Sequence, residues 1–481
     1  MNNSKISLRE TFSRRKLLKN IGLMGAISVL LPLTKASASG NNKDFTSVPE
    51  LQRAIELASS GDVFTLAPGT YTDAEIIINQ SGLTISAKSP GTVIFNGASQ
   101  IDIKSDSNIF SGFQFLDGDI PGIVIKVSGS KNQLIDLNFS GYSAEKYINV
   151  EEGSQYNEIS YCNFENKPAS APIGNLVGVI PHQEIPGFHR IRFCSFKNLP
   201  GPGGDYGNEP IRLGVGAKSD FISRTIIENC YWENTGLGDS ESISVKCREN
   251  VIRYCTFKDN KEGMLVFRNG NDNMAYGNTF IDAGGIRVKE ASNIFCFSNY
   301  FENSGFGGRA SSVSFDYIPG NLQNINFLFN TFVNCSPIYL GGEGPLLNKW
   351  SNNLFSNNAG AIFQGANSGT KWIGNIYQGS SGLATTAGLK AGVLKLTKKL
   401  NDYFRLSTMS GFRPTSLPGF VSPVMYSGLM PPNPLSKDLV KTSRPLKITQ
   451  WDVGSIQYSK IPARTIWLTS KTTGPRYLQA S

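Results

Sequence analysis

Asn157-Glu158-Ile159-Ser160-Tyr161-Cys162-Asn163-Phe164 is one copy of a pattern that recurs through most of this chain. Polar and apolar residues alternate in it, and it ends in three residues of which the third is aromatic and the first is usually Asn or Cys. The same ending recurs at Phe113-Gln114-Phe115, Leu137-Asn138-Phe139, Cys194-Ser195-Phe196, Cys230-Tyr231-Trp232, Cys255-Thr256-Phe257, Asn278-Thr279-Phe280, Asn299-Tyr300-Phe301, Asn330-Thr331-Phe332, Asn353-Leu354-Phe355 and Asn375-Ile376-Tyr377.

Most copies follow one another after 21 to 25 residues, and gaps of 32, 36 and 31 residues mark expected insertions. A period in the low twenties with one short strand pattern per repeat is typical of a solenoid. Alternation with period two indicates strands and not helices. We therefore predict an all-β fold, a right-handed parallel β-helix, in which residues one repeat apart lie about 4.8 Å apart.

The ends of the solenoid differ from its coils. Residues 45–55 have the pattern of a capped amphipathic helix, with Leu51, Ala54, Ile55 and Ala58 on one face, and we expect this helix to cover the first coil. The repeats end near residue 380, and a proline-rich stretch follows. The predicted organisation is residues 1–38 as a signal peptide, 39–380 as the β-helix, and 381–481 as a C-terminal segment that packs on the helix or caps it.

The N-terminus has the pattern of an export signal. Ser13-Arg14-Arg15-Lys16-Leu17-Leu18-Lys19 is a twin-arginine motif, followed by an apolar run from Ile21 to Leu33 and a small-residue cleavage site ending at Ala38. The alternative, a membrane anchor, is disfavoured because the run is short for a span. We expect a periplasmic or secreted protein, cleaved after Ala38, without a membrane anchor in its mature form.

The net charge of +9 is concentrated in that signal. Residues 39–481 hold 39 Lys/Arg against 36 Asp/Glu, a net charge of +3. We therefore expect no nucleic-acid partner, and binding of any polyanion must depend on local patches. Four of the seven cysteines recur at one position of the repeat, which predicts a buried column of free thiols: Cys162, Cys194, Cys230 and Cys255.

Basic residues recur between inward apolar residues on successive repeats. Ile243, Val245 and Cys247 alternate with an outward Lys246, and the same alternation places Arg212, Arg268 and Arg287 outward. We predict that these four cations form one outward column. Like charges this close are unfavourable without an anion, so the column favours a linear polyanion as ligand.

Acidic and amide residues precede two of these strands: Asp205, Asn208 and Glu209 before Arg212, and Asp239 and Glu241 before Lys246. Oxygen ligands on adjacent turns suit a hard cation such as calcium. The alternative is that the acids only form salt bridges with the basic column. Glu241 and Lys246 are five residues apart, so both reach one face only if a bend or bulge lies near Ser242.

Four blocks in order resemble polysaccharide lyase family 6, which contains alginate lyases and chondroitinase B. They are Gly207-Asn208-Glu209-Pro210-Ile211-Arg212-Leu213-Gly214, Glu241-Ser242-Ile243-Ser244-Val245-Lys246, Leu265-Val266-Phe267-Arg268-Asn269-Gly270-Asn271 and Gly284-Gly285-Ile286-Arg287-Val288. Asp438, Arg444 and Asp452-Val453-Gly454 also resemble the family's ending.

The resemblance implies roles for individual residues. Lys246 matches the catalytic base and Arg268 the acid at the leaving oxygen; Arg287 matches a substrate-binding arginine. The implied calcium ligands are Asn208, Asp239 and Glu241. Arg212 and Asn269 are further candidates for substrate binding, as is Arg309, the one obvious candidate for a sulfate partner farther along the cleft. The chain departs from alginate-cleaving relatives at Asn269 (usually His), Cys247 (usually Ser) and Asp239 (frequently Glu).

The predicted function is calcium-assisted β-elimination from alginate, an anionic polysaccharide, giving 4,5-unsaturated oligosaccharides. A glycosaminoglycan lyase acting on dermatan sulfate is an alternative within the family. A hydrolase with two carboxylates at the scissile bond is a second alternative, but it leaves Lys246 and Arg268 unexplained. A non-catalytic carbohydrate-binding β-helix, using the basic column only for docking, is a third.

Overall fold

The computed structural model describes residues 42–479 except 200, 202–206, 237–240, 308–310, 317–322, 341–346, 366–368, 399–401, 408–412, 415–433 and 459–466. The predicted signal peptide, Asp205, Asp239 and Arg309 lie outside the described residues, so the export route and the roles of these residues stay predictions. Apart from Pro434, the described residues belong to one compact unit formed by residues 39–424 and 435–481. In this part of the chain, no helix is long and apolar enough to cross a membrane.

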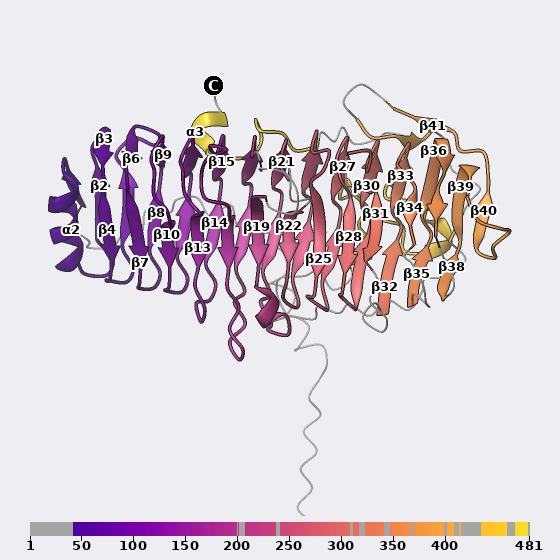
Figure 1. Cartoon of the computed structure of the whole chain (residues 1–481), viewed down its shortest axis with the longest axis horizontal. Coiled ribbons are helices and arrows are strands. Elements are labelled where there is room, and N and C mark those ends of the chain that lie inside the picture. The colour runs from indigo at the N-terminus through magenta and orange to yellow at the C-terminus, as the bar shows by residue number, and fades with distance from the viewer. Residues whose placement is uncertain are drawn as a thin grey trace, which may run out of the picture. The chain divides into compact units, whose positions relative to one another are not determined.

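Three parallel sheets run along the solenoid, and most coils add one strand to each sheet (Figure 1). Sheet A has 14 strands: β1 (Asn42–Phe45), β2 (Val63–Leu66), β5 (Thr84–Ala87), β8 (Ile109–Ser111), β11 (Gln133–Ile135), β14 (Glu158–Ser160), β17 (Arg190–Arg192), β20 (Ile226–Glu228), β23 (Val251–Arg253), β26 (Met274–Tyr276), β29 (Ile294–Phe297), β32 (Gln323–Leu328), β35 (Leu347–Ser351) and β38 (Thr370–Ile373).

Sheet B also has 14 strands: β3 (Gly69–Thr72), β6 (Val93–Asn96), β9 (Phe113–Leu116), β12 (Asn138–Ser140), β15 (Asn163–Glu165), β18 (Ser195–Lys197), β21 (Tyr231–Glu233), β24 (Thr256–Lys258), β27 (Thr279–Ile281), β30 (Tyr300–Glu302), β33 (Thr331–Val333), β36 (Leu354–Ala361), β39 (Asn375–Ser380) and β40 (Leu389–Ala391).

Sheet C, which carries the candidate site, has ten strands: β4 (Glu75–Ile78), β7 (Gln100–Ile103), β10 (Ile123–Val127), β13 (Lys146–Val150), β16 (Asn175–Val179), β19 (Glu209–Leu213), β22 (Glu241–Val245), β25 (Met264–Arg268), β28 (Ile286–Lys289) and β31 (Val313–Asp316). The remaining elements are two short strand pairs, β34 (Ile338–Tyr339) with β37 (Phe363–Gln364) and β41 (Leu396–Thr397) with β42 (Arg405–Leu406), and the helices α2 (Val48–Glu56), η1 (Gly216–Lys218), η2 (Pro434–Ser436), η3 (Ile448–Gln450) and α3 (Arg476–Gln479). The predicted all-β parallel β-helix is confirmed.

The aromatic residue of the repeat forms a continuous stack inside the solenoid. Neighbouring rings are stacked with centroids 4.4 to 5.3 Å apart along Phe115, Phe139, Phe164, Phe196, Trp232, Phe257, Phe280, Phe301, Phe332 and Phe355. Because each coil contributes one ring at the same position, the stack holds neighbouring coils in register.

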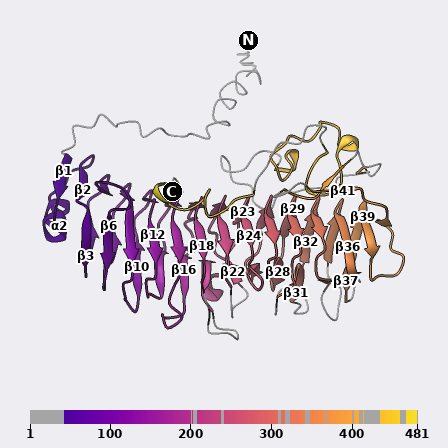
Figure 2. The same ribbon diagram turned by 90° about the horizontal axis from the view of Figure 1, so that it is seen from above.

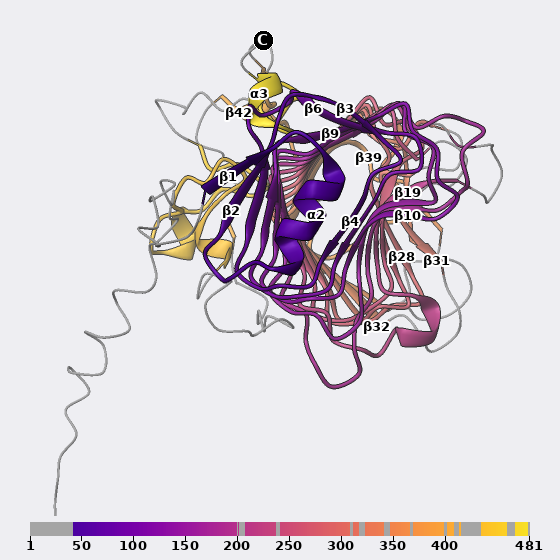
Figure 3. The same ribbon diagram turned by 90° about the vertical axis from the view of Figure 1, so that its left-hand side faces the viewer.

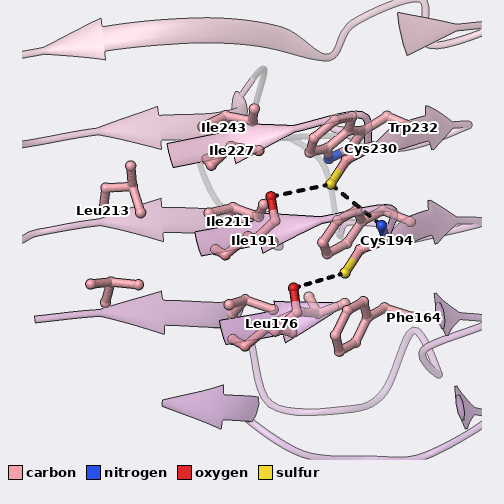
Figure 4. Close-up of a cluster of buried hydrophobic side chains, with 14 of the residues drawn as sticks. Phe164, Leu176, Ile191, Cys194, Ile211, Leu213, Ile227, Cys230, Trp232 and Ile243 are labelled. Atoms are coloured by element: carbon pink, nitrogen blue, oxygen red, sulfur yellow. Dashed lines mark hydrogen bonds between the residues drawn. The ribbon is translucent and has the colours of Figure 1, made fainter. Parts of the chain in front are cut away.

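The first residue of the repeated ending forms a second internal ladder. In the later coils, the backbone N–H and side-chain Nδ2 of one Asn both donate to Oδ1 of the next at 2.8 to 3.0 Å, through Asn278, Asn299, Asn330, Asn353 and Asn375. The earlier coils have buried cysteines there, two of which are drawn in Figure 4. All seven cysteines are buried and free, which confirms the predicted free thiols.

Helix α2 covers the first coil, as Figure 3 shows. Leu51 and Ile55 are fully buried, and Ala54 and Ala58 pack against the same core. Ser47 is the N-cap residue, but its side chain makes no capping hydrogen bond, so burial of the apolar face and not capping holds the helix in place. The predicted helical cap is confirmed.

Residues after 434 run back along the outside of the coils (Figure 2). Ser455 N–H donates to Thr331 Oγ1 at 2.9 Å, and Arg476 pairs with Asp136 at 2.5 Å, 340 residues earlier in the chain. These contacts fasten the chain end to coils that are distant in sequence.

Candidate active site

The candidate site lies on the outward face of sheet C, across β19, β22 and β25. Alternate residues of these strands point into the core and are fully buried, namely Ile211, Leu213, Ile243, Val245, Leu265 and Phe267. The residues between them, including Arg212 and Arg287, therefore belong to the outward face.

The predicted single column of four cations is wrong in its register. Arg212 pairs with Ser244, Ser244 with Val266, and Val266 with Arg287, so the two arginines share one row with uncharged residues between them. Lys246 and Arg268 directly follow the paired residues Val245 and Phe267, which places them side by side in a second row. Arg268 in turn pairs with Lys289, so this second row holds three basic residues on successive coils, and only the row of Arg212 and Arg287 is interrupted by uncharged residues.

The bulge expected near Ser242 is confirmed. In the pairing of β22 with β25, the register shifts between Glu241 and Ile243. The Ser242 side chain is fully buried and accepts a hydrogen bond from Asn260 Nδ2 at 2.7 Å. A bulge changes the direction of a side chain in this way, and here it allows Glu241 to reach Arg268 on the outward face.

Glu209 is the centre of the charged network. Its Oε1 lies 3.1 Å from Lys246 Nζ, and its Oε2 accepts a hydrogen bond from Arg212 Nε. Only 2% of the Glu209 side chain is exposed. Burial by itself raises the pKa of Glu209, but the charges of Arg212 and Lys246 and their hydrogen bonds outweigh it and hold the pKa below its usual value.

Glu241 has the corresponding role beside Arg268. Arg268 Nη1 donates to Glu241 Oε1 at 3.0 Å, and Glu241 is buried whereas 37% of the Arg268 side chain is exposed. The second oxygen, Glu241 Oε2, is buried and has no hydrogen-bond partner among the described residues. Lys246 and Arg268 are therefore each held by a buried carboxylate, as the salt-bridge alternative expected.

Asn208, a predicted calcium ligand, contacts a lysine. Lys167 Nζ donates to Asn208 Oδ1 at 2.8 Å, and the Gly174 N–H reaches the same oxygen at 3.4 Å. Lys167 is almost fully buried. Burial lowers its pKa to about 8, although the charge of Glu145 raises it in part, so Lys167 is mainly protonated at neutral pH.

The other candidates follow the ends of strands β22 and β25. Asn269 follows Arg268 and donates to Glu290 Oε2 at 2.8 Å. Cys247 points into the core and is fully buried, so its thiol does not reach the outward face. A Cβ on Gly214, which has a φ of +82°, would lie 2.9 Å from Cys247 Cβ, so glycine permits the close approach of these coils.

The described residues, as they are arranged, do not fit a calcium ion. The Asn208 oxygen accepts from an ammonium group and Glu241 Oε1 from a guanidinium group, so Glu241 Oε2 is the single oxygen that the described ligand candidates leave for a cation. Among the described residues, no three His, Cys, Asp or Glu side chains form a group that could hold a metal. Asp239 lies outside the description, and the calcium role stays a prediction.

Sequence reasoning missed Lys167 and left Glu209 without a role of its own. Glu209 could have been found from the repeat, because it precedes Arg212 by three residues. Lys167 gave no signal, because it lies in an insertion between β15 and β16, and its partner is 41 residues later.

Comparisons with known proteins agree with this geometry. The family described as Chondroitinase B matches residues 45–346, which is more than half of the chain. The PL6 family alginate lyase AlyGC is 24% identical over 76% of this chain with a TM-score of 0.69; the match spans 55% of AlyGC, so the chain corresponds to about half of that protein's length.

Two other solved structures match more of their own length. A mannuronic acid specific polysaccharide family 6 lyase from human gut microbiota is 21% identical over 73% of this chain and 90% of its own, with a TM-score of 0.62. The PL6 family polysaccharide lyase Pedsa3628 from Pseudopedobacter saltans is 19% identical over 91% of this chain and 99% of its own, also with a TM-score of 0.62. No curated protein matches the chain. From the family match and the shared fold, we conclude that the chain belongs to polysaccharide lyase family 6, the family of chondroitinase B.

Proposed function

We propose that this chain cleaves alginate by β-elimination. The observation that carries the proposal is the pairing of Lys246 and Arg268, which lie one coil apart on an outward face and are each held by a buried glutamate. One residue suited to accept a proton and one suited to stabilise a leaving oxygen thus lie beside the same stretch of a bound polymer.

In the proposed reaction, Lys246 first releases a proton from its ammonium group to solvent and then, as the neutral amine, removes the proton from C5 of a uronate residue. Glu209 accepts an N–H of the Lys246 amine and orients its lone pair toward the substrate. The electron pair of the broken C5–H bond forms a C4=C5 double bond as the C4–O4 bond breaks. The departing O4 takes up a proton from solvent water, and Arg268 beside it stabilises the developing negative charge.

The C5 proton is only weakly acidic while the adjacent carboxylate is negative. Positive charge beside that carboxylate stabilises the enolate-like intermediate. In the described residues, Arg212, Arg268 and Lys167 supply such charge around the site. A bound calcium ion would supply it as a Lewis acid.

Alginate is the favoured substrate because similar structures are described as PL6 alginate lyases. Dermatan sulfate is the second candidate, supported by the name of the matching family. A sulfated polymer is expected to require further basic residues, and Arg309, the candidate for that role, lies outside the described residues.

The proposal is tested by incubating the purified protein with alginate, its two homopolymeric blocks, pectate and dermatan sulfate. Formation of the conjugated double bond is followed by ultraviolet absorbance, with Lys246→Ala as the inactive control and Lys371→Ala, an exposed lysine on sheet A, as the matched active one. Formation of the product from dermatan sulfate and not from alginate would refute the assignment of alginate as the substrate. Polymer binding without any product would favour the non-catalytic alternative.

A further inference from the structure

The oxygen that would ligate calcium at Asn208 is already bound to a positive group. Lys167 Nζ lies 2.8 Å from Asn208 Oδ1 and 3.5 Å from the Glu145 carbonyl oxygen, and only 1% of the lysine is exposed. With the Gly174 N–H at 3.4 Å, Asn208 Oδ1 accepts from two donors, which matches its two lone pairs. A cation entering here has to displace the ammonium group.

The charge of the surroundings also disfavours a further cation. Glu209 is in contact with both Arg212 and Lys246, and Glu241 with Arg268. Calcium prefers six to eight oxygen ligands with several carboxylates among them. The two described carboxylates of this site are already outnumbered by three basic side chains, before Lys167 is counted.

The polarity of the Asn208 amide follows from this contact. Because Oδ1 faces the ammonium group, the other polar atom of the amide is the donor Nδ2. A donor suits the carboxylate of a substrate and does not suit a metal ion. Lys167 therefore fixes the orientation of the Asn208 amide.

We propose that the Lys167 ammonium takes the place of calcium at Asn208, so that this chain needs no calcium for turnover. The inference depends on the proposed elimination from a uronate, and it specifies which group offsets the negative charge of the substrate carboxylate. Lys167 acts as a positioning residue: it orients Asn208 and adds a fixed positive charge near the bound carboxylate, without touching the reacting atoms.

The first test uses the unmodified protein and does not depend on turnover. Calcium and, separately, the luminescent probe terbium are titrated into metal-free wild-type protein and into Glu241→Gln. We expect neither ion to show saturable binding that is present in the wild type and absent from Glu241→Gln. Turnover of alginate should agree within about twofold between chelator and added calcium. Saturable calcium binding at Glu241, or turnover that disappears in chelator and returns with calcium, would overturn the proposal.

The second test removes the charge and keeps the length of the side chain. Lys167→Met should lower turnover in chelator by at least about tenfold, the size expected for loss of one charged interaction. Terbium binding should appear in this variant, and added calcium should restore part of its turnover. Lys167→Arg should retain more turnover than Lys167→Met, and Lys371→Met on sheet A should behave as wild type.

Melting temperatures of the variants separate loss of fold from loss of function. A folded Lys167→Met protein with normal turnover and no calcium binding would refute the role of Lys167. If the wild type forms no unsaturated product from any uronate polymer, the proposed function fails. The calcium and terbium titrations still decide in that case whether Lys167 excludes the metal.

Discussion

Glu209→Gln tests whether the buried carboxylate organises the catalytic lysine. The substitution keeps the size of the side chain and an acceptor oxygen, but it removes the charge that faces Lys246 and Arg212. Attraction between unit charges 3.1 Å apart is about 5 kcal/mol at an effective dielectric constant of 20, and the cost of burying the charges offsets much of it.

Breaking a buried ion pair by removing one partner usually costs about 3 to 5 kcal/mol. Since Gln retains a hydrogen-bond acceptor, we expect a loss near the lower end, about 3 kcal/mol in the free energy of unfolding. Turnover should fall by about 10- to 100-fold, because the Lys246 amine loses the carboxylate that orients it. Denaturant unfolding and initial rates on alginate measure the two effects.

The pH dependence provides a second check. In the folded state the pKa of Glu209 is held below 4.5, the usual value for a glutamate, so its charge stabilises the fold above that pH. This stabilisation is lost as the pH falls through the lowered pKa. The difference in unfolding free energy between wild type and Glu209→Gln should therefore be constant near neutral pH and should shrink below about pH 4.5.

Glu158→Gln is the matched control. Glu158 pairs with Arg192 on sheet A at 2.8 Å, away from sheet C, and is more exposed than Glu209. It should cost less stability and leave turnover unchanged. The reasoning is refuted if Glu209→Gln matches Glu158→Gln in both stability and turnover, or if its stability deficit persists unchanged at low pH.

Four other substitutions have defined outcomes. Lys246→Ala and Arg268→Ala should each lower kcat/KM by at least about 10²-fold, and the double variant should be little worse than the poorer single one, because both groups serve one step. Trp232→Ala should reduce the unfolding free energy by about 3 to 5 kcal/mol in denaturant titrations, since it removes one ring from the internal stack. Gly214→Ala should lower the melting temperature, because a Cβ there meets Cys247 at a positive φ; an unchanged melting temperature would contradict the close approach of these coils.

The internal aromatic stack and the Asn ladder could be predicted because the repeats place the same residue types at the same positions. The stack through Phe164 and Trp232 and the ladder through Asn330 depend only on the period and on alternation within each strand. The bulge at Ser242 was also predictable, because alternation alone would place Glu241 and Lys246 on opposite faces.

The register of the cations was not predictable in the same way. Alternation assigns Arg212 and Lys246 to one face, but it does not say how far along its strand each residue lies. Insertions interrupt the repeat in this region, where successive copies are 32 and 36 residues apart. These irregular spacings conceal the two-residue offset between the row of Arg212 and the row of Lys246. Lys167 was missed for a related reason: it lies in an inserted loop, outside the repeat that guided the prediction.

The two-row arrangement explains how a nearly neutral chain can bind a polyanion. Residues 39–481 have a net charge of only +3, so long-range attraction is weak. On sheet C, however, the carboxylates of Glu209 and Glu241 are buried, whereas Arg212 and Arg268 remain partly exposed. The buried acids allow the basic groups to lie close together, and the exposed ends present positive charge to the polymer. Charges in solvent are screened beyond about 8 Å at physiological ionic strength. This attraction therefore acts only on a polymer that already lies along sheet C. It favours a bound substrate that runs parallel to the stack of coils.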